Sequence, residues 1–152
     1  MESKQPVKYD LIALIAQNEI LAQVAKNEFP HIVIDARPQE ISGRSKALSI
    51  KLKIRCKIRI ELVDGSFIET VRSYKGDYSI HWDCTMINPG EIYRHDREAH
   101  PNLRHLATFP KHFHNGTEKN IVESYISDDP KQALREFLIS VQQKITLRIM
   151  QP

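Results

Sequence analysis

The sequence predicts a single α+β domain: an antiparallel meander sheet of about four to six strands, with N-terminal and C-terminal helices packed on one face. Three observations support this class: an apolar helical period near each end of the chain, and strict apolar–polar alternation between them. A chain of 152 residues with 41% hydrophobic content can bury one core, so residues 1–152 are expected to form one domain.

Composition favours a cytoplasmic setting. No apolar run approaches the length that crosses a bilayer, so no membrane partner is expected, and the N-terminal residues lack the apolar core of a secretory signal. The two cysteines, Cys56 and Cys84, stand far apart and in no paired motif, which is typical of a reduced protein.

The first third of the chain is predicted to hold a helix, a short strand and a loop. Apolar residues recur near helical spacing from Asp10 to about Glu28, and the pattern ends before a Phe-Pro pair. His31 to Ala36 then reads as a short strand. Arg37 to Ala47 contains proline, glycine and several polar residues, which predict a loop.

The clearest periodicity lies between Leu48 and Leu62, where apolar residues alternate strictly with charged or polar ones. This alternation predicts a long strand with one face buried and one open. The Asp64–Gly65 pair that follows predicts a hairpin turn, because these residues tolerate positive φ. The open face of the strand carries a row of five cations: Lys51, Lys53, Arg55, Lys57 and Arg59.

Three antiparallel strands are expected next, separated by glycine-containing turns: Phe67–Tyr74, Tyr78–Cys84 and Glu91–Asp96, the last of the meander. Ala99 to Gly116 has two prolines and no clean period, which predicts a loop crossing the sheet. Ile121–Ile126 is predicted to be a further short strand. An aspartate cap and a proline at Pro130 then predict the start of a final amphipathic helix.

Functional residues are expected between Tyr93 and His114. This segment holds five of the seven histidines, His95, His100, His105, His112 and His114, among arginine and aspartate residues. Histidine can donate or accept a proton near neutral pH and is the commonest transition-metal ligand. A single histidine more often satisfies a backbone group, but this density favours a catalytic or metal-binding site. The histidines interpreted as structural are His31, His81 and His105.

Strand geometry would let several of these residues converge. Arg94 and Asp96 would share one strand face, with His95 on the other, and His112 and His114 would share a face if their segment is extended. The candidate catalytic residues, which would meet if the loop folds back on the sheet, are Arg94, Asp96, His100, His112 and His114.

These five residues hold the parts for cleaving a phosphodiester without a metal or other cofactor. One histidine would take a proton from the attacking hydroxyl, and another would protonate the leaving oxygen. Arg94 would stabilise charge on the phosphate, and Asp96 would orient one imidazole.

Two alternatives remain open. The histidines and Asp96 also match the ligands of zinc, iron or nickel, so the cluster could hold a transition metal in a metal-binding protein or a metal-dependent hydrolase. The cationic row suits a polyanion, so the protein could instead be a non-enzymatic nucleic-acid-binding module. The five cations could also have no binding role and simply form a sheet face that is exposed to solvent.

The motifs of the histidine-rich segment resemble those of the TumE family of toxin–antitoxin proteins. Two motifs carry the resemblance: Arg-x-Asp-x-x-x-His, which begins at Arg94, and Phe-Pro-x-His-x-His, which begins at Phe109. The resemblance extends over roughly Leu48 to Lys144. It implies a toxin neutralised by a cognate antitoxin, often a helix-turn-helix protein.

From the residues themselves we predict that such a toxin acts on RNA as a metal-independent endoribonuclease. The RNA target, the assignment of acid and base among the histidines, and the presence of a homodimer are left open by the sequence.

Overall fold

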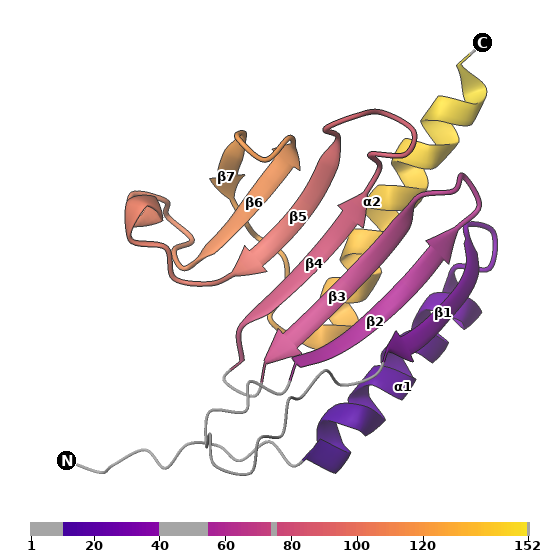
Figure 1. The fold of residues 1–152 in the computed structure, drawn as a ribbon, viewed down its shortest axis with the longest axis horizontal. Coiled ribbons are helices and arrows are strands. Elements are labelled where there is room, and N and C mark those ends of the chain that lie inside the picture. The colour runs from indigo at the N-terminus through magenta and orange to yellow at the C-terminus, as the bar shows by residue number, and fades with distance from the viewer. Residues whose placement is uncertain (1–10, 40–54, 74–75, 152) are drawn as a thin grey trace.

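In the part of the chain that the structure describes, seven antiparallel strands form one sheet, which two helices cover on one face (Figure 1). The computed structural model describes residues 11–39, 55–73 and 76–151. The strands lie in the sheet in chain order. The elements are α1 (Leu11–Glu28), β1 (Val33–Gln39), β2 (Arg55–Leu62), β3 (Phe67–Ser73), β4 (Tyr78–Asp83), β5 (Ile92–Arg97), the 3-10 helix η1 (Pro101–Leu103), β6 (Lys111–Gly116), β7 (Ile121–Glu123) and α2 (Pro130–Met150). The predicted α+β class is confirmed, with more strands than expected.

The long C-terminal helix forms where the cap and the apolar stripe predict it. The Asp129 carboxylate accepts a hydrogen bond from the backbone N–H of Gln132 at 2.9 Å, and Pro130 occupies the first turn. The stripe that this helix buries consists of Ala133, Leu134, Phe137, Leu138, Val141 and Ile145. Neither described helix combines the length and the apolar composition needed to cross a membrane.

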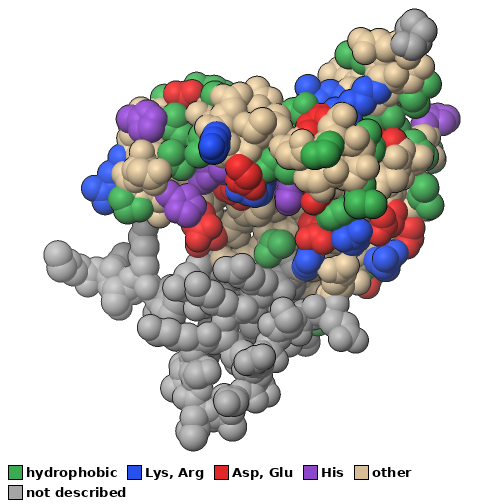
Figure 2. Space-filling model, turned by 45° about the horizontal axis from the view of Figure 1, so that its top comes forward, with side chains coloured by type: hydrophobic (Ala, Val, Ile, Leu, Met, Phe, Trp, Pro, Cys, Tyr) green, Lys and Arg blue, Asp and Glu red, His purple; other side chains and the backbone are tan. Residues whose placement is uncertain are grey.

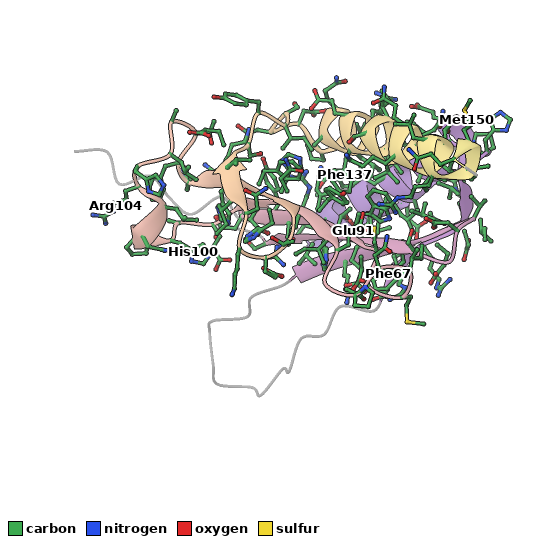
Figure 3. All side chains as sticks on the ribbon, turned by 90° about the horizontal axis from the view of Figure 1, so that it is seen from above. Phe67, Glu91, His100, Arg104, Phe137 and Met150 are labelled. Atoms are coloured by element: carbon green, nitrogen blue, oxygen red, sulfur yellow. The ribbon has the colours of Figure 1, made fainter. Side chains whose placement is uncertain are left out.

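The two faces of the sheet differ because apolar and polar residues alternate along its strands. Ile60, Ile68 and Trp82 are neighbours in register and are buried in the core that both helices share. The Trp82 indole N–H donates to Ser66 Oγ at 2.8 Å, which satisfies its one polar atom. Figure 3 shows the two layers from above, with Phe137 of α2 directed toward the sheet. Polar side chains therefore collect on the face away from the helices.

The predicted hairpin between β2 and β3 is confirmed. Gly65 has a φ of 86°, and its N–H donates to the carbonyl of Leu62 at 3.1 Å. Residues 48–54 of the predicted long strand lie outside the described residues, so the strand is observed only from Arg55 onward.

Two segments predicted as loops contain strands. β1 continues through Arg37 and Pro38 to Gln39, and the proline is tolerated because β1 is an edge strand of the described sheet. Within Ala99–Gly116, residues 111–116 form β6, so β5 is not the last strand of the meander. The buried positions of β6 are histidines, and a search for apolar alternation therefore missed it.

Burial along α2 predicts that alanine substitutions at two adjacent residues have very different effects on stability. Leu138 is 0% exposed and Ile139 is 51% exposed. Leu138→Ala should lower the free energy of unfolding by about 3 kcal/mol, since it opens a cavity between helix and sheet. Ile139→Ala, the matched control, should change it by less than about 0.5 kcal/mol. Urea denaturation of both variants measures the difference, and equal losses would contradict this packing.

Candidate active site

The antiparallel pairing of β5 and β6 brings four candidate residues together. Arg94 lies opposite His114, and Asp96 lies opposite His112. Side chains of directly paired residues point to the same face, so all four project from the face away from the helices. They line a cleft of about 640 Å³ that also receives His100. In Figure 2, histidine, acidic and basic side chains gather around a hollow in the surface.

Asp96 lies at the centre of this group and is buried. Its Oδ2 atom is 2.7 Å from Arg94 Nε, 3.3 Å from His114 Nε2 and 3.5 Å from His112 Nε2. Burial opposes ionisation of Asp96, but hydrogen bonds from His114 and Arg94 outweigh it and lower the pKa to about 2. The carboxylate is therefore charged at neutral pH.

Backbone carbonyls fix the orientation of both β6 imidazoles. His112 Nδ1 lies 3.2 Å from the carbonyl oxygen of Pro110, which follows a cis Phe109–Pro110 bond, and His114 Nδ1 lies 2.8 Å from that of Glu118. A carbonyl can only accept, so both Nδ1 atoms carry hydrogens. Each ring consequently turns its Nε2 atom toward Asp96.

The surroundings displace the pKa values of the two imidazoles in opposite directions. Burial lowers the pKa of His112 below its usual range, despite the opposing effects of Pro110 and Asp96. The hydrogen bond to Asp96 raises the pKa of His114, and this effect exceeds that of burial. Their ring centroids are only 5.2 Å apart. Adjacent histidines in one cleft are thus biased toward opposite protonation states.

His100 reaches the cleft from the loop between β5 and β6. It precedes η1, and its ring centroid lies 5.4 Å from that of His112. Its side chain is 47% exposed, so it stands at the mouth of the cleft while His112 and His114 form the floor. Figure 3 shows His100 beside Arg104 at the end of the molecule formed by this loop. All five candidate catalytic residues therefore line one cleft.

His81 of β4 also lines the cleft, although the sequence interpretation made it structural. It pairs in register with Arg94, and its buried Nε2 has no hydrogen-bond partner among the described residues. The signal was present in the sequence: Ile80 and Trp82 are buried against the helices, so the residue between them faces the other way.

Glu118, in the turn between β6 and β7, is a second residue that the sequence analysis missed. Its carboxylate oxygens accept from Arg94 Nη1 at 2.8 Å and from Arg94 Nη2 at 3.0 Å. No local pattern marks it, because the contact depends on how the turn is placed over β5. Arg94 is thus held between two carboxylates.

His95 and Phe113 face the helices. The rings stack with centroids 4.0 Å apart, and His95 meets Phe137 of α2 edge-on. His95 Nδ1 lies 2.7 Å from Ser124 Oγ, and burial lowers its pKa to about 4. The prediction that His95 points away from Arg94 and Asp96 is confirmed.

The cationic row on β2 is only partly described. Lys51 and Lys53 lie outside the described residues, as does the side chain of Arg55. Lys57 forms an ion pair with Glu69 at 2.8 Å, and Arg59 pairs with Glu61 at 2.8 Å and with Glu69 at 3.1 Å. Acidic neighbours therefore offset the charges of these two cations.

The low pKa of Asp96 predicts a loss of stability in acid. Its folded-state pKa of about 2 lies below the unfolded value of 3.8, so ionisation contributes roughly 2 kcal/mol above pH 4. This contribution disappears as pH falls toward 2. In urea titrations, Asp96→Asn should be less stable than wild type at pH 7, and the difference should narrow between about pH 4 and pH 2.

Glu98→Gln, which removes an exposed carboxylate at the same cleft, is the control. It should be close to wild type in stability at pH 7. If the free energies of unfolding of wild type and Asp96→Asn differ by the same amount at every pH, the electrostatic account of Asp96 is contradicted.

Comparison with known proteins identifies the family. The family model described as Toxin TumE matches residues 30–145, which is most of the chain and runs from β1 into α2. No curated protein and no solved structure is significantly similar to this chain. The matched range contains both motifs and the whole cleft floor. The chain therefore belongs to the TumE toxin family and is the toxin component of a toxin–antitoxin system, whose partner is an antitoxin.

Proposed function

We propose that this toxin is a metal-independent endoribonuclease that cleaves RNA by acid–base catalysis. The supporting observation is the pair of neighbouring imidazoles, His112 and His114, whose pKa values are displaced in opposite directions beside one guanidinium. Groups whose surroundings separate their pKa values in this way are suited to act as base and acid in one reaction.

His112 is assigned as the general base. Because Nδ1 carries the hydrogen that binds the Pro110 carbonyl, the neutral ring has its lone pair on Nε2. Burial lowers the pKa of His112, which keeps this lone pair free near neutral pH. Nε2 takes the proton of the ribose 2′-hydroxyl as that oxygen attacks the adjacent phosphorus.

His114 is assigned as the general acid. Its proton is retained on Nε2 by Asp96, 3.3 Å away. This proton passes to the 5′-oxygen as the P–O bond breaks, and the products are a 2′,3′-cyclic phosphate and a 5′-hydroxyl. The neutral ring can then accept a hydrogen bond from Arg94 Nη2, which lies 3.1 Å from Nε2. Arg94 therefore stabilises the acid after it has given up its proton.

Arg94 is assigned to the phosphate because guanidinium N–H groups match phosphate oxygens in geometry and in charge. Asp96 is a positioning residue, since it binds Arg94 Nε and faces both imidazoles. His100, at the mouth of the cleft, is placed to contact the RNA chain that enters.

Removal of the base tests the proposal. His112→Ala should reduce the rate of RNA cleavage by roughly 10²- to 10⁴-fold, because proton transfer from the attacking hydroxyl is lost. His105→Ala is the control. It removes an exposed histidine from the segment between β5 and β6 and should leave the cleavage rate unchanged. The rate is measured on labelled RNA with purified toxin, and growth and RNA integrity are followed in cells without antitoxin.

Since His112 is buried, His112→Asn should be made in parallel, and thermal unfolding should show that both variants fold. Cleavage by a folded His112 variant at the wild-type rate would overturn its assignment as base. RNA binding that weakens steeply with salt, without any turnover by the wild type, would favour the non-enzymatic module.

A metal-dependent hydrolase is the second candidate, because ligand atoms of Asp96, His112 and His114 all lie within 4.8 Å of one another. Both Nδ1 hydrogens bind backbone carbonyls, an arrangement common among metal-ligating histidines. Arg94 argues against this candidate: its guanidinium contacts Asp96 Oδ2 and His114 Nε2, where its charge would repel a divalent cation.

The two candidates differ in the chemistry of the nucleophile. Acid–base cleavage needs the 2′-hydroxyl, so an RNA with a single 2′-deoxyribose at the scissile position should resist cleavage, and activity should persist in chelator. A metal-bound hydroxide attacks without the 2′-hydroxyl. Cleavage of the deoxy-substituted substrate that stops in chelator would therefore select the metal-dependent reaction.

A further inference from the structure

The Glu118 carboxylate forms two hydrogen bonds with the guanidinium of Arg94, in the geometry in which arginine also binds phosphate. Arg94 Nη1 donates to Glu118 Oε1 at 2.8 Å, and Nη2 donates to Oε2 at 3.0 Å. Two parallel N–H···O bonds of this kind are the shared mode of carboxylate and phosphate recognition by arginine. The carboxylate oxygens therefore stand where two phosphate oxygens would bind.

The two carboxylates on Arg94 differ in how easily they can leave. Asp96 is buried and holds Nε at 2.7 Å, which fixes the direction of the guanidinium. The Glu118 side chain is 60% exposed, so water can solvate it when it moves away. Exposed ion pairs contribute little stability, whereas a buried charge that loses its partner is costly. Glu118 is thus the exchangeable partner of Arg94.

The turn that carries Glu118 has an attachment independent of its carboxylate. His114 Nδ1 donates to the backbone carbonyl of Glu118 at 2.8 Å. The side chain can rotate out of the site while this backbone contact remains. Release of the carboxylate, whose Oε2 lies 3.5 Å from His114 Nδ1, therefore leaves the backbone contact of the imidazole assigned as the acid in place.

The other arginine of the cleft lacks such a contact. Arg97 Nη1 lies 3.8 Å from Asp77 Oδ1, a distance beyond a normal hydrogen bond, and both side chains are more exposed than Arg94. The two-pronged carboxylate contact is therefore a particular feature of Arg94 within this cleft.

We propose that the Glu118 carboxylate occupies the phosphate subsite of the free toxin and that a phosphate group of the substrate displaces it. This inference rests on the proposed function for the role of Arg94 and adds a residue that sets the affinity and specificity of the subsite. The Glu118 carboxylate therefore weakens the binding of isolated anions, whereas a nucleic-acid phosphate held by further contacts in the cleft displaces it.

Glu118→Gln tests the inference with inorganic phosphate as the probe. The amide keeps the size of the side chain and removes its charge, so phosphate should bind roughly fivefold more tightly than to the wild type. Glu98→Gln is the matched control, because it changes the net charge equally at the same cleft, and none of the described contacts joins Glu98 to Arg94. Its phosphate affinity should be much closer to that of the wild type.

Binding is measured by NMR titration of the intact toxin, following the Arg94 side-chain Nε–H signal where Arg94 is present and the backbone N–H signals of β5 and β6 in every variant. An affinity gain in Glu118→Gln that exceeds the gain in Glu98→Gln supports the subsite. Equal affinities in the two variants would overturn it, as would phosphate binding that survives Arg94→Gln.

The outcome is independent of RNA cleavage. If wild-type toxin cleaves RNA but Glu118→Gln shows no selective gain in phosphate affinity, the subsite assignment fails and the proposed function stands. If Glu118→Gln shows the gain but the wild type does not cleave RNA, the subsite stands and the proposed function fails.

Discussion

The buried carboxylate of Asp96 is the interaction on which the arrangement of the cleft depends. A charge away from water needs compensating partners, and Asp96 obtains them from its own strand through Arg94 and from β6 through His114. Without the carboxylate, a guanidinium and an imidazole favouring protonation would stand 3.1 Å apart with nothing between their charges. The register of β5 and β6 and the chemistry of the cleft are therefore coupled through one side chain.

Strand β6 connects the cleft to the core, because its side chains contribute to both faces of the sheet. His112 and His114 point into the cleft, while Phe113 between them stacks on His95 and so connects β6 to Phe137 of α2. The strand is held by apolar and aromatic packing on one side and by charged contacts on the other. A strand held on both sides can keep its two imidazoles in a fixed relation, which the proposed acid–base reaction requires.

The sequence could predict which residues share a face more readily than which segments pair. Period-two spacing is local, so the grouping of Arg94 with Asp96 and of His112 with His114 followed directly, and α2 was equally evident from its cap and stripe. The sequence predicts a loop in place of β6 because the residues of this strand that point into the cleft are histidines, whose burial depends on Asp96 across the strand pair. Glu118 was invisible for the same reason: its partner lies 24 positions away. Long-range polar contacts leave no period in the sequence.

The charges around Arg94 indicate which anion suits the cleft. In the free toxin, the carboxylates of Asp96 and Glu118 balance the cation Arg94 and the charge of His114 in its protonated form, which the hydrogen bond to Asp96 favours by raising the pKa of that imidazole. If one singly charged phosphodiester replaces the Glu118 carboxylate, this balance is preserved, and no net charge is transferred into the partly buried site. Metal binding at His114 would release the proton of that imidazole, so a divalent cation beside Arg94 would instead leave one net positive charge that the described neighbours do not compensate. Burial makes such an imbalance expensive. The site as built therefore favours exchange of one monoanion for another, which is the substitution that the proposed binding of an RNA backbone phosphate requires.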